Sequence, residues 1–551
     1  MTILEMNNIQ KYIKERLLFK LEGRITISKN DRIGIVGLNG AGKSTFLSVL
    51  AGKAELDAGT ISHKINMIEI SQNEEASISV EFSCNLSKWG IGKEMHAGMS
   101  GGEKMRMKIA EALDRPFDLL LADEPTSHLD LSGITKLEQE IKNVQGAVII
   151  VSHDRAFLDA VCTKMIEIDN ERMIEYQGNY SAYLEQKEVH LNRAQFEYDE
   201  YTREKSRLQQ AFKEKQSKAK TMKKKPKRMS YKEANLGAEK ARSKQAKVNR
   251  SAKTIEKRIE QLEKKEKPIQ KDQAIFDASQ HKRIHNKFVI KMELVNKQMV
   301  DRTLFKDLNV MIKPGMKVAL IGNNGIGKST LLRMIAKQEV GISVSGICKI
   351  GYLHQTLNDL NQGQSILENV LETSTYSQEK VRTILARMLF KRDEVHKKVS
   401  VLSGGERVKV ALAKCFVSDA NLLLLDEPTN YLDIPTQESL QKVLKEYPGT
   451  ILFATHDRRL INQLATYTLL IENEKGLLHE GNYDALLKRR QERQTKESSF
   501  IDSNEEELLK IEHELSEVIG KLGYITDLSV KQDLENRYES LLKQKRELKV
   551  T

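Results

Sequence analysis

A phosphate-binding motif occurs twice in this chain of 551 residues. The pattern Gly-x-x-x-x-Gly-Lys-Ser spans Gly37–Ser44 and again Gly322–Ser329, an offset of 285. Three further motifs, SGGE, DEPT and a His-Asp pair, follow each copy in the same order and repeat at an offset of 303. A motif series that recurs in order predicts two copies of one domain.

Short apolar runs precede these motifs in both copies, as in FDLLLADE and NLLLLDE. Runs that are apolar at nearly every position are typical of strands buried on both faces of a parallel sheet. The polar motifs then fall at the C-terminal ends of the strands, where open α/β sheets bind ligands. The expected fold class is therefore α/β, with two P-loop ATPase domains.

The glycine-rich loops predict phosphate binding. Glycines let backbone N–H groups surround the phosphates, the lysine reaches the β- and γ-phosphates, and the serine hydroxyl binds Mg²⁺. Two matches, each after an apolar strand and before a helical pattern, argue against a chance match in a glycine-rich turn. The expected phosphate contacts are Gly37, Asn39, Gly40, Gly42, Lys43, Ser44 and Thr45, and in the second copy Gly322, Asn324, Gly325, Gly327, Lys328, Ser329 and Thr330.

Adjacent acids end one apolar run in each copy, Asp123 with Glu124 and Asp426 with Glu427. The aspartates are placed to hold Mg²⁺ through water, and the glutamates to polarise the attacking water. Acid pairs at strand ends are more often helix caps or loop residues, but the P-loop and the following Pro-Thr turn favour the catalytic interpretation. His153 and His456 follow 29 residues after the glutamates, and this matched spacing favours a γ-phosphate contact over an ordinary loop histidine.

Taken together, SGGE, Gln72 and Gln355, DEPT and the His-Asp pairs resemble the ABC ATPase family. The resemblance implies ATP and Mg²⁺ as cofactors, a monomer, and head-to-tail pairing of its two domains. One site would combine Lys43, Ser44, Gln72, Asp123, Glu124 and His153 with Ser403, Gly404 and Gly405. The other would combine Lys328, Ser329, Gln355, Asp426, Glu427 and His456 with Ser100, Gly101 and Gly102. The implied Mg²⁺ ligands are Ser44, Gln72, Asp123, Ser329, Gln355 and Asp426. An aromatic that stacks on adenine is expected before each loop; Tyr12 is the candidate in the first copy, and the second copy has no comparable aromatic.

Residues 186–281 carry neither a P-loop nor a strand pattern. Two series step by three and four residues, as helix seams do; they are Leu191, Ala194, Tyr198, Tyr201, Lys205, Leu208 and Phe212, and then Ala241, Lys244, Val248, Ala252, Ile255, Ile259 and Leu262. Pro226 and Gly237 between them predict an antiparallel hairpin with arms of roughly 45 Å. A second helical hairpin is expected after Arg490, either as a cap on the second ATPase domain or as a further contact with the partner that the linker meets. The expected domains are 1–185, 186–281, 282–490 and 491–551.

Positive charge is concentrated on this linker. Residues 201–270 contain 24 Lys and Arg against 8 Asp and Glu, whereas the whole chain has a net charge of +12. A lysine run is as often a solvated face as a polyanion contact, but a rigid hairpin that ends in cations favours the polyanion. The expected RNA-contacting residues are Lys220, Met222, Lys223, Lys224, Lys225, Lys227 and Arg228, which we call the basic tip.

This arrangement resembles the ABC-F family, and most of all its Vga-type antibiotic-resistance members. The resemblance implies binding to the ribosome from the tRNA exit site, with the tip near 23S rRNA of the peptidyl transferase centre and the P-site tRNA. It also implies protection from lincosamides, pleuromutilins and group A streptogramins. A housekeeping translation factor of the same fold is the alternative.

An ATPase subunit of a membrane transporter is a weaker alternative. No run of 18 apolar residues occurs, the start of the chain lacks a signal-peptide pattern, and the four cysteines form no CxxC pair. A cytoplasmic protein with no membrane partner is expected.

Overall fold

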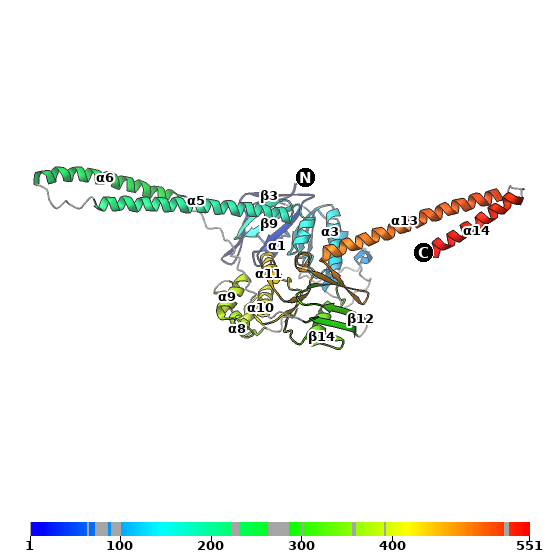
Figure 1. Ribbon diagram of the computed structural model, residues 1–551. Coiled ribbons are helices and arrows are strands. Elements are labelled where there is room, and N and C mark those ends of the chain that lie inside the picture. Colours follow the sequence, from blue (N-terminus) through cyan, green and yellow to red (C-terminus); the bar gives the residue numbers. More distant parts are fainter. Residues whose placement is uncertain are drawn as a thin grey trace. The chain divides into compact units, whose positions relative to one another are not determined.

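The computed structural model describes residues 2–62, 65–71, 86–89, 101–221, 231–262, 286–299, 302–354, 360–390, 393–522 and 528–550. Contacts divide the chain into two units, Met1–Phe276 with Leu432–Thr436 and Asp277–Tyr431 with Gln437–Thr551. Each unit contains one copy of the repeated motifs on a sheet whose central strands are parallel. The ribbon in Figure 1 is coloured along the sequence from blue to red.

The first unit has a sheet whose central strands are parallel. These strands lie in the order β6 (Met67–Ile70), β7 (Leu119–Asp123), β8 (Ala147–Val151), β4 (Arg32–Gly37) and β9 (Lys164–Asp169). The sheet continues through the antiparallel β10 (Arg172–Gln177) to β2 (Arg16–Lys20), β1 (Thr2–Ile13) and β3 (Arg24–Ser28), with β5 (Ala58–Ser62) on β1.

Both faces of this sheet are covered. Leu120 and Val148 contribute to the apolar core on one face, and their neighbours Leu119 and Ile149 to the core on the other face. The helices are α1 (Lys43–Leu50), α2 (Gly101–Asp114), α3 (Leu131–Asn143) and α4 (Arg155–Val161), with a short 3₁₀ turn η1 (Leu86–Trp89). The prediction of strands buried on both faces is confirmed.

The second unit repeats the design. Its sheet has the order β15 (Ile350–Leu353), β16 (Leu422–Asp426), β17 (Thr450–Ala454), β13 (Lys317–Ile321), β18 (Tyr467–Glu472) and β19 (Lys475–Glu480), and only β19 is antiparallel to its neighbour. A separate small sheet contains β12 (Arg302–Ile312), β11 (Ile290–Met299) and β14 (Ile342–Val344). The helices are α7 (Lys328–Lys337), α8 (Ile366–Leu371), α9 (Gln378–Arg387), α10 (Gly404–Val417), α11 (Ile434–Glu446) and α12 (Arg458–Leu464), with 3₁₀ turns at Glu394–His396 and Val399–Val401.

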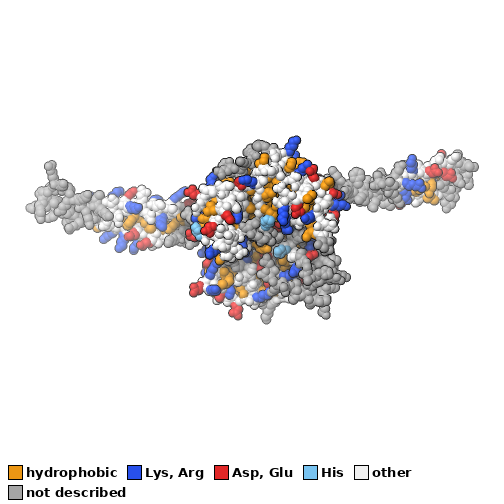
Figure 2. All heavy atoms as spheres, turned by 90° about the horizontal axis from the view of Figure 1, so that it is seen from below, with side chains coloured by type: hydrophobic (Ala, Val, Ile, Leu, Met, Phe, Trp, Pro, Cys, Tyr) orange, Lys and Arg blue, Asp and Glu red, His pale blue; other side chains and the backbone are white. Residues whose placement is uncertain are grey.

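A long helical hairpin belongs to the first unit. Helix α5 (Tyr180–Thr221) packs on α4 and β10 at its start and on α6 (Tyr231–Gln261) further along. The predicted seam holds on α5 from Tyr198 to Phe212 and on α6 from Val248 to Ile259, and Leu208 and Ala252 are buried. The side chain of Ala241 lies outside the described residues. Figure 2 shows lysine and arginine interspersed with acids along the described part of the hairpin, where pairs such as Arg193 with Glu197 lie one turn apart.

Three details of the predicted hairpin are wrong. Leu191, Ala194 and Lys244 are exposed, so the described pairing of the two helices does not bury these three members of the predicted seams. Gly237 lies inside α6 rather than in the turn, since the surrounding alanines, leucine and glutamates offset the roughly 1 kcal/mol penalty of one helical glycine. The predicted arm of roughly 45 Å corresponds to about 30 residues at 1.5 Å per residue. Helix α5 is longer, with 42 residues.

A second hairpin closes the chain. Helices α13 (Tyr483–Leu522) and α14 (Leu528–Val550) pack together through Leu515, Val518 and Leu541, with Tyr538 beside them. The hairpin expected after Arg490 is confirmed, although its first helix already begins at Tyr483. Among the described residues, no helix is long and apolar enough to cross a membrane.

Candidate nucleotide-binding sites

The first glycine-rich loop joins β4 to α1 and requires its glycines. A Cβ on Gly37 would lie 2.5 Å from the carbonyl oxygen of Ile168, so no side chain fits there. Gly40 and Gly42 have φ of 76° and 95°, which side chains disfavour. Lys43 opens α1, and its ammonium donates to the carbonyls of Gly37 (2.9 Å) and Leu38 (3.1 Å). The loop therefore surrounds a buried cation, as a polyphosphate site requires.

The second loop reproduces this geometry. A Cβ on Gly322 would lie 2.9 Å from the carbonyl oxygen of Ile471, and Gly325 and Gly327 have φ of 75° and 107°. The Lys328 ammonium donates to the carbonyls of Gly322 (2.7 Å) and Asn323 (3.2 Å). Thr45 and Thr330 follow the two serines in the first turns of α1 and α7. The two loops are thus equivalent in backbone and lysine placement.

A serine and an aspartate meet in each site. The Ser329 hydroxyl lies 3.0 Å from an Asp426 carboxylate oxygen, and Ser44 bonds Asp123 in the same way. Burial raises the pKa of Asp123 and of Asp426 above the ordinary value, and the nearby ammonium groups of Lys43 and Lys328 offset this only in part. A hydroxyl beside a buried carboxylate is an oxygen pair that Mg²⁺ prefers, and the residues present fit that ion.

The glutamates after these aspartates hold a strained backbone. Glu124 and Glu427 both have φ of 50°, in the left-handed region that glutamate rarely adopts. Their N–H groups donate to the carbonyls of Val151 (2.8 Å) and Ala454 (2.9 Å), which tie each turn to the neighbouring strand. Burial raises the pKa of both carboxyls to about 8. The sequence contains no signal for this backbone conformation.

A histidine from the next strand end faces each glutamate. His153 Nε2 lies 3.6 Å from Glu124 Oε1, and His456 Nε2 lies 3.3 Å from Glu427 Oε1. Burial lowers the pKa of His153 to about 4, so its ring is neutral at pH 7. The structure brings together the residues that the matched spacing selected, and a neutral imidazole keeps one N–H to donate.

The SGGE motif forms a capped helix start in the second unit. The Ser403 hydroxyl accepts the Glu406 N–H (3.3 Å), and the Glu406 carboxylate accepts the Ser403 N–H (2.8 Å). Gly404 and Gly405 form the first turn of α10 without side chains over their N–H groups. Such a helix start attracts anions. In the first unit Gly101 and Gly102 are the first two residues of α2.

Several predicted site residues lie outside the described part of the chain. These are Gln72, Ser100 and Gln355, and from the basic tip Met222, Lys223, Lys224, Lys225, Lys227 and Arg228; the side chain of Lys220 is likewise not described.

The structure also identifies a residue that the sequence analysis missed. Tyr12, the adenine candidate of the first copy, is 39% exposed where the β1 register shifts. In the second copy Arg302 opens β12, with Nη1 3.7 Å from the position of a Cβ on Gly325. Phe305 packs beside Gly327 as Phe19 packs beside Gly42. Arg302 stands three residues before Phe305 as Arg16 stands three residues before Phe19, and this matched spacing was the available signal.

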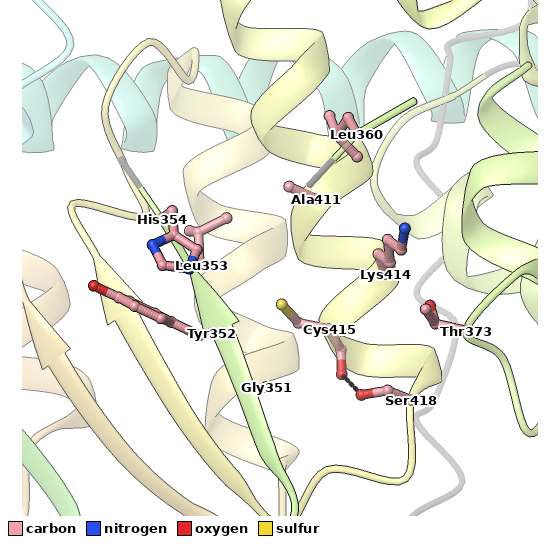
Figure 3. Close-up of a pocket in the computed structure, with 10 residues that line it drawn as sticks. All are labelled: Gly351, Tyr352, Leu353, His354, Leu360, Thr373, Ala411, Lys414, Cys415 and Ser418. Atoms are coloured by element: carbon pink, nitrogen blue, oxygen red, sulfur yellow. Dashed lines mark hydrogen bonds between the residues drawn. The ribbon is translucent and has the colours of Figure 1, made fainter. Parts of the chain in front are cut away.

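A cavity of about 310 Å³ lies beside the second site (Figure 3). Its walls are the end of β15, the second half of α10 and the segment around Thr373. The Cys415 sulfur points toward β15, and the rings of Tyr352 and His354 lie 3.7 Å apart. The cavity therefore separates the strand that leads to Gln355 from the helix that begins with Gly404.

Known proteins are similar to this chain in sequence. The family model described as "ABC transporter" matches residues 22–89 and 305–430. The ribosome protection protein VmlR of Bacillus subtilis is 33% identical over 99% of this chain and 98% of its own length. The erythromycin resistance ATP-binding protein MsrA of Staphylococcus epidermidis is 35% identical over 79% of this chain and 91% of its own. The ABC transporter F family member 5 of Arabidopsis thaliana is 30% identical over 92% of this chain and 80% of its own.

These relatives match the chain across both glycine-rich loops and the hairpin that joins them. The expected fold and the expected ATPase activity are thereby confirmed, with two ATP-binding domains. The chain belongs to the ABC-F family of ATP-binding cassette ATPases.

Proposed function

We propose that ATP binding closes two composite sites and that hydrolysis reopens them. In each site the lysine and glycine loop hold the phosphates, while serine and aspartate hold the Mg²⁺ that offsets phosphate charge. Glu124 and Glu427 polarise the attacking water, and His153 and His456 contact the γ-phosphate. Ser403–Gly405 complete the first site and Ser100–Gly102 the second. Because bound ATP would contact both units only in the closed state, ATP binding stabilises that state.

We further propose that this cytoplasmic ATPase protects the ribosome from antibiotics of the peptidyl transferase centre. The hairpin enters from the tRNA exit site, and the basic tip approaches 23S rRNA near the P-site tRNA. The carrying observation is the similarity to a ribosome protection protein over 99% of the chain, which includes the hairpin. The lysine-rich sequence of the basic tip supports contact with RNA phosphates.

A housekeeping translation factor is the second candidate. Similarity alone does not separate the two candidates, since the plant F family member, whose name mentions no resistance, is 30% identical and VmlR is 33% identical. The candidates differ in whether expression protects cells from a drug.

Growth of a sensitive bacterium that expresses this chain separates them. The intact chain should raise the inhibitory concentrations of a lincosamide, a pleuromutilin and a group A streptogramin. Versions lacking residues 222–230, or carrying Glu124→Gln with Glu427→Gln, should not. Erythromycin belongs in the panel because one relative is an erythromycin resistance protein. Ribosome pelleting without protection would favour the housekeeping role, and a failure to pellet would exclude both.

A further inference from the structure

A buried ionic cluster lies where helix α5 leaves the first sheet. The Glu167 carboxylate on β9 accepts hydrogen bonds from the hydroxyls of Tyr183 (2.8 Å) and Tyr176 (3.3 Å), and it also contacts the Lys187 ammonium. Tyr183 and Lys187 belong to the first turns of α5, and Tyr176 belongs to β10. Glu167, Tyr176 and Tyr183 are each at most 5% exposed, and the two tyrosine rings meet edge to face at 5.0 Å.

The same short segment of β9 lies against the first glycine-rich loop. Glu167 pairs with Val36 in the parallel ladder, and Val36 directly precedes Gly37. The next residue of β9, Ile168, is the one whose carbonyl oxygen leaves no room for a Cβ on Gly37. Of these two adjacent residues of β9, Ile168 therefore contacts the phosphate loop and Glu167 contacts the base of α5.

The second copy provides an internal comparison. Leu470 pairs with Ile321, which directly precedes Gly322, so it stands where Glu167 stands in the first copy. By the same 303-residue offset, Leu486 of the second copy corresponds to Tyr183 of the first copy. Both Leu470 and Leu486 are buried. The same offset places Arg490 where Lys187 stands, and Arg490 pairs instead with the exposed Glu472 at the end of β18. The buried part of the corresponding joint between α13 and its sheet is therefore apolar.

This difference argues that the cluster does more than hold α5 in place. Burial of a carboxylate is costly even when it is paired, and apolar residues of similar size stabilise such a joint at least as well. A carboxylate that accepts several hydrogen bonds constrains the orientation of its partners, because hydrogen bonds weaken steeply when the distance or angle departs from the optimum. An apolar contact between leucines has no such geometric requirement. The cluster thus fixes both the rotation and the register of α5 on β9.

We propose that Glu167 is a positioning residue that couples helix α5 to the first phosphate loop. Nucleotide at Gly37–Ser44 shifts β9 and thereby the base of α5. By reciprocity, a force on the hairpin changes nucleotide affinity at the first loop and leaves the second unaffected. The coupling requires nucleotide binding at Lys43 and does not depend on which partner the hairpin meets.

Hydrogen exchange at the base of α5 tests this coupling. The background is the full chain with Glu124→Gln and Glu427→Gln, and peptides from residues 180–192 are followed with and without Mg-ATP. ATP should change exchange there by about fivefold or more. The double variant Glu167→Leu with Tyr183→Leu, which reproduces the apolar joint of the second copy, should abolish this response while still binding ATP. Glu188→Leu, an exposed change one turn later on α5, is the matched control and should keep it.

Affinity at each site provides the second readout. Fluorescent ATP is titrated in the Lys328→Ala background for the first site and in the Lys43→Ala background for the second. The double variant should change affinity only at the first site. If it folds with the parent melting temperature and keeps the parent exchange response, the coupling is refuted. If it does not fold, Glu167→Gln and Tyr183→Phe replace it, and an unchanged response in both refutes the proposal equally. A parent whose α5 does not respond to ATP would also overturn it.

Discussion

At the scale of single residues, Glu124 and Glu427 occupy matching positions, each buried and each held at a φ of 50°. Replacing both with glutamine keeps the shape and removes the group proposed to polarise water. ATP hydrolysis should fall about 100-fold or more, while ATP binding persists. Phosphate release and nucleotide titration measure the two effects.

The matched control for this change is Glu171→Gln with Glu474→Gln. These glutamates also have positive φ, of 67° and 65°, but they lie exposed in the turns after β9 and β18. The control should hydrolyse ATP like the parent. An equal loss of activity in both double variants would show that backbone strain rather than the carboxylate is responsible.

Cys162 provides a second prediction at this scale. It is buried after α4, and burial raises the pKa of its thiol to about 12. Because the thiolate is the reactive form, alkylation at pH 8 should be about a thousandfold slower in the folded protein than in urea. Peptide mass spectrometry after a pulse of iodoacetamide measures this rate. Rapid labelling without denaturant would contradict the burial of Cys162.

Residue identities could be predicted at these sites, but several geometric details could not. The motifs selected Lys43, Asp426 and His153 because their chemistry depends on residue type and order. The left-handed backbone of Glu124 and the approach of Arg302 to Gly325 depend on how separate strands pack. Local sequence does not encode such packing.

At the scale of elements, the hairpin depends on a thin apolar seam. Leu208 on α5 is 6% exposed where α5 packs on α6. Leu208→Ala should cost about 2 kcal/mol and loosen α6, because a buried side chain leaves a cavity that two helices close only in part. Amide exchange across residues 244–261 should therefore accelerate. Gln209→Ala, a change at an exposed neighbour on α5, is the control. An equal effect of the two changes would show that burial of Leu208 does not stabilise the pairing of α5 with α6.

Helices and strands were predictable where one period extends over many residues. The buried strands and both hairpins follow from apolar spacing, and Leu515 and Leu541 pack together in the second hairpin. Helix ends were less predictable, because tertiary contacts determine them. The Arg32 guanidinium, for example, donates to the carbonyls of Ile141, Val144 and Gly146 at the end of α3. No periodic pattern in the sequence predicts these hydrogen bonds from Arg32.

At the scale of the whole molecule, the charge of the basic tip should govern affinity for the ribosome. Neutralising Lys223, Lys224, Lys225 and Lys227 to glutamine removes cations that release counterions from RNA. The slope of log affinity against log salt should become shallower by about 1 for each lysine that contacts a phosphate. Pelleting with purified ribosomes across a salt series measures the slope.

The control removes the same charge elsewhere. Lys337, Lys442, Lys475 and Lys488 are exposed in the second unit, and their replacement by glutamine keeps the total charge equal to that of the tip variant. A slope that changes equally in the two variants would indicate a response to net charge rather than to the basic tip.

Because α5 is long, the position of its far end depends strongly on the orientation of its first residues. With 42 residues the helix is about 63 Å long, so a tilt of one degree at Tyr180 displaces its far end by about 1 Å. An error of a few degrees would miss a target of atomic size. Accuracy at the distant end of the hairpin is therefore determined within its first two turns, by side chains such as Tyr183 and Lys187 that never approach the target.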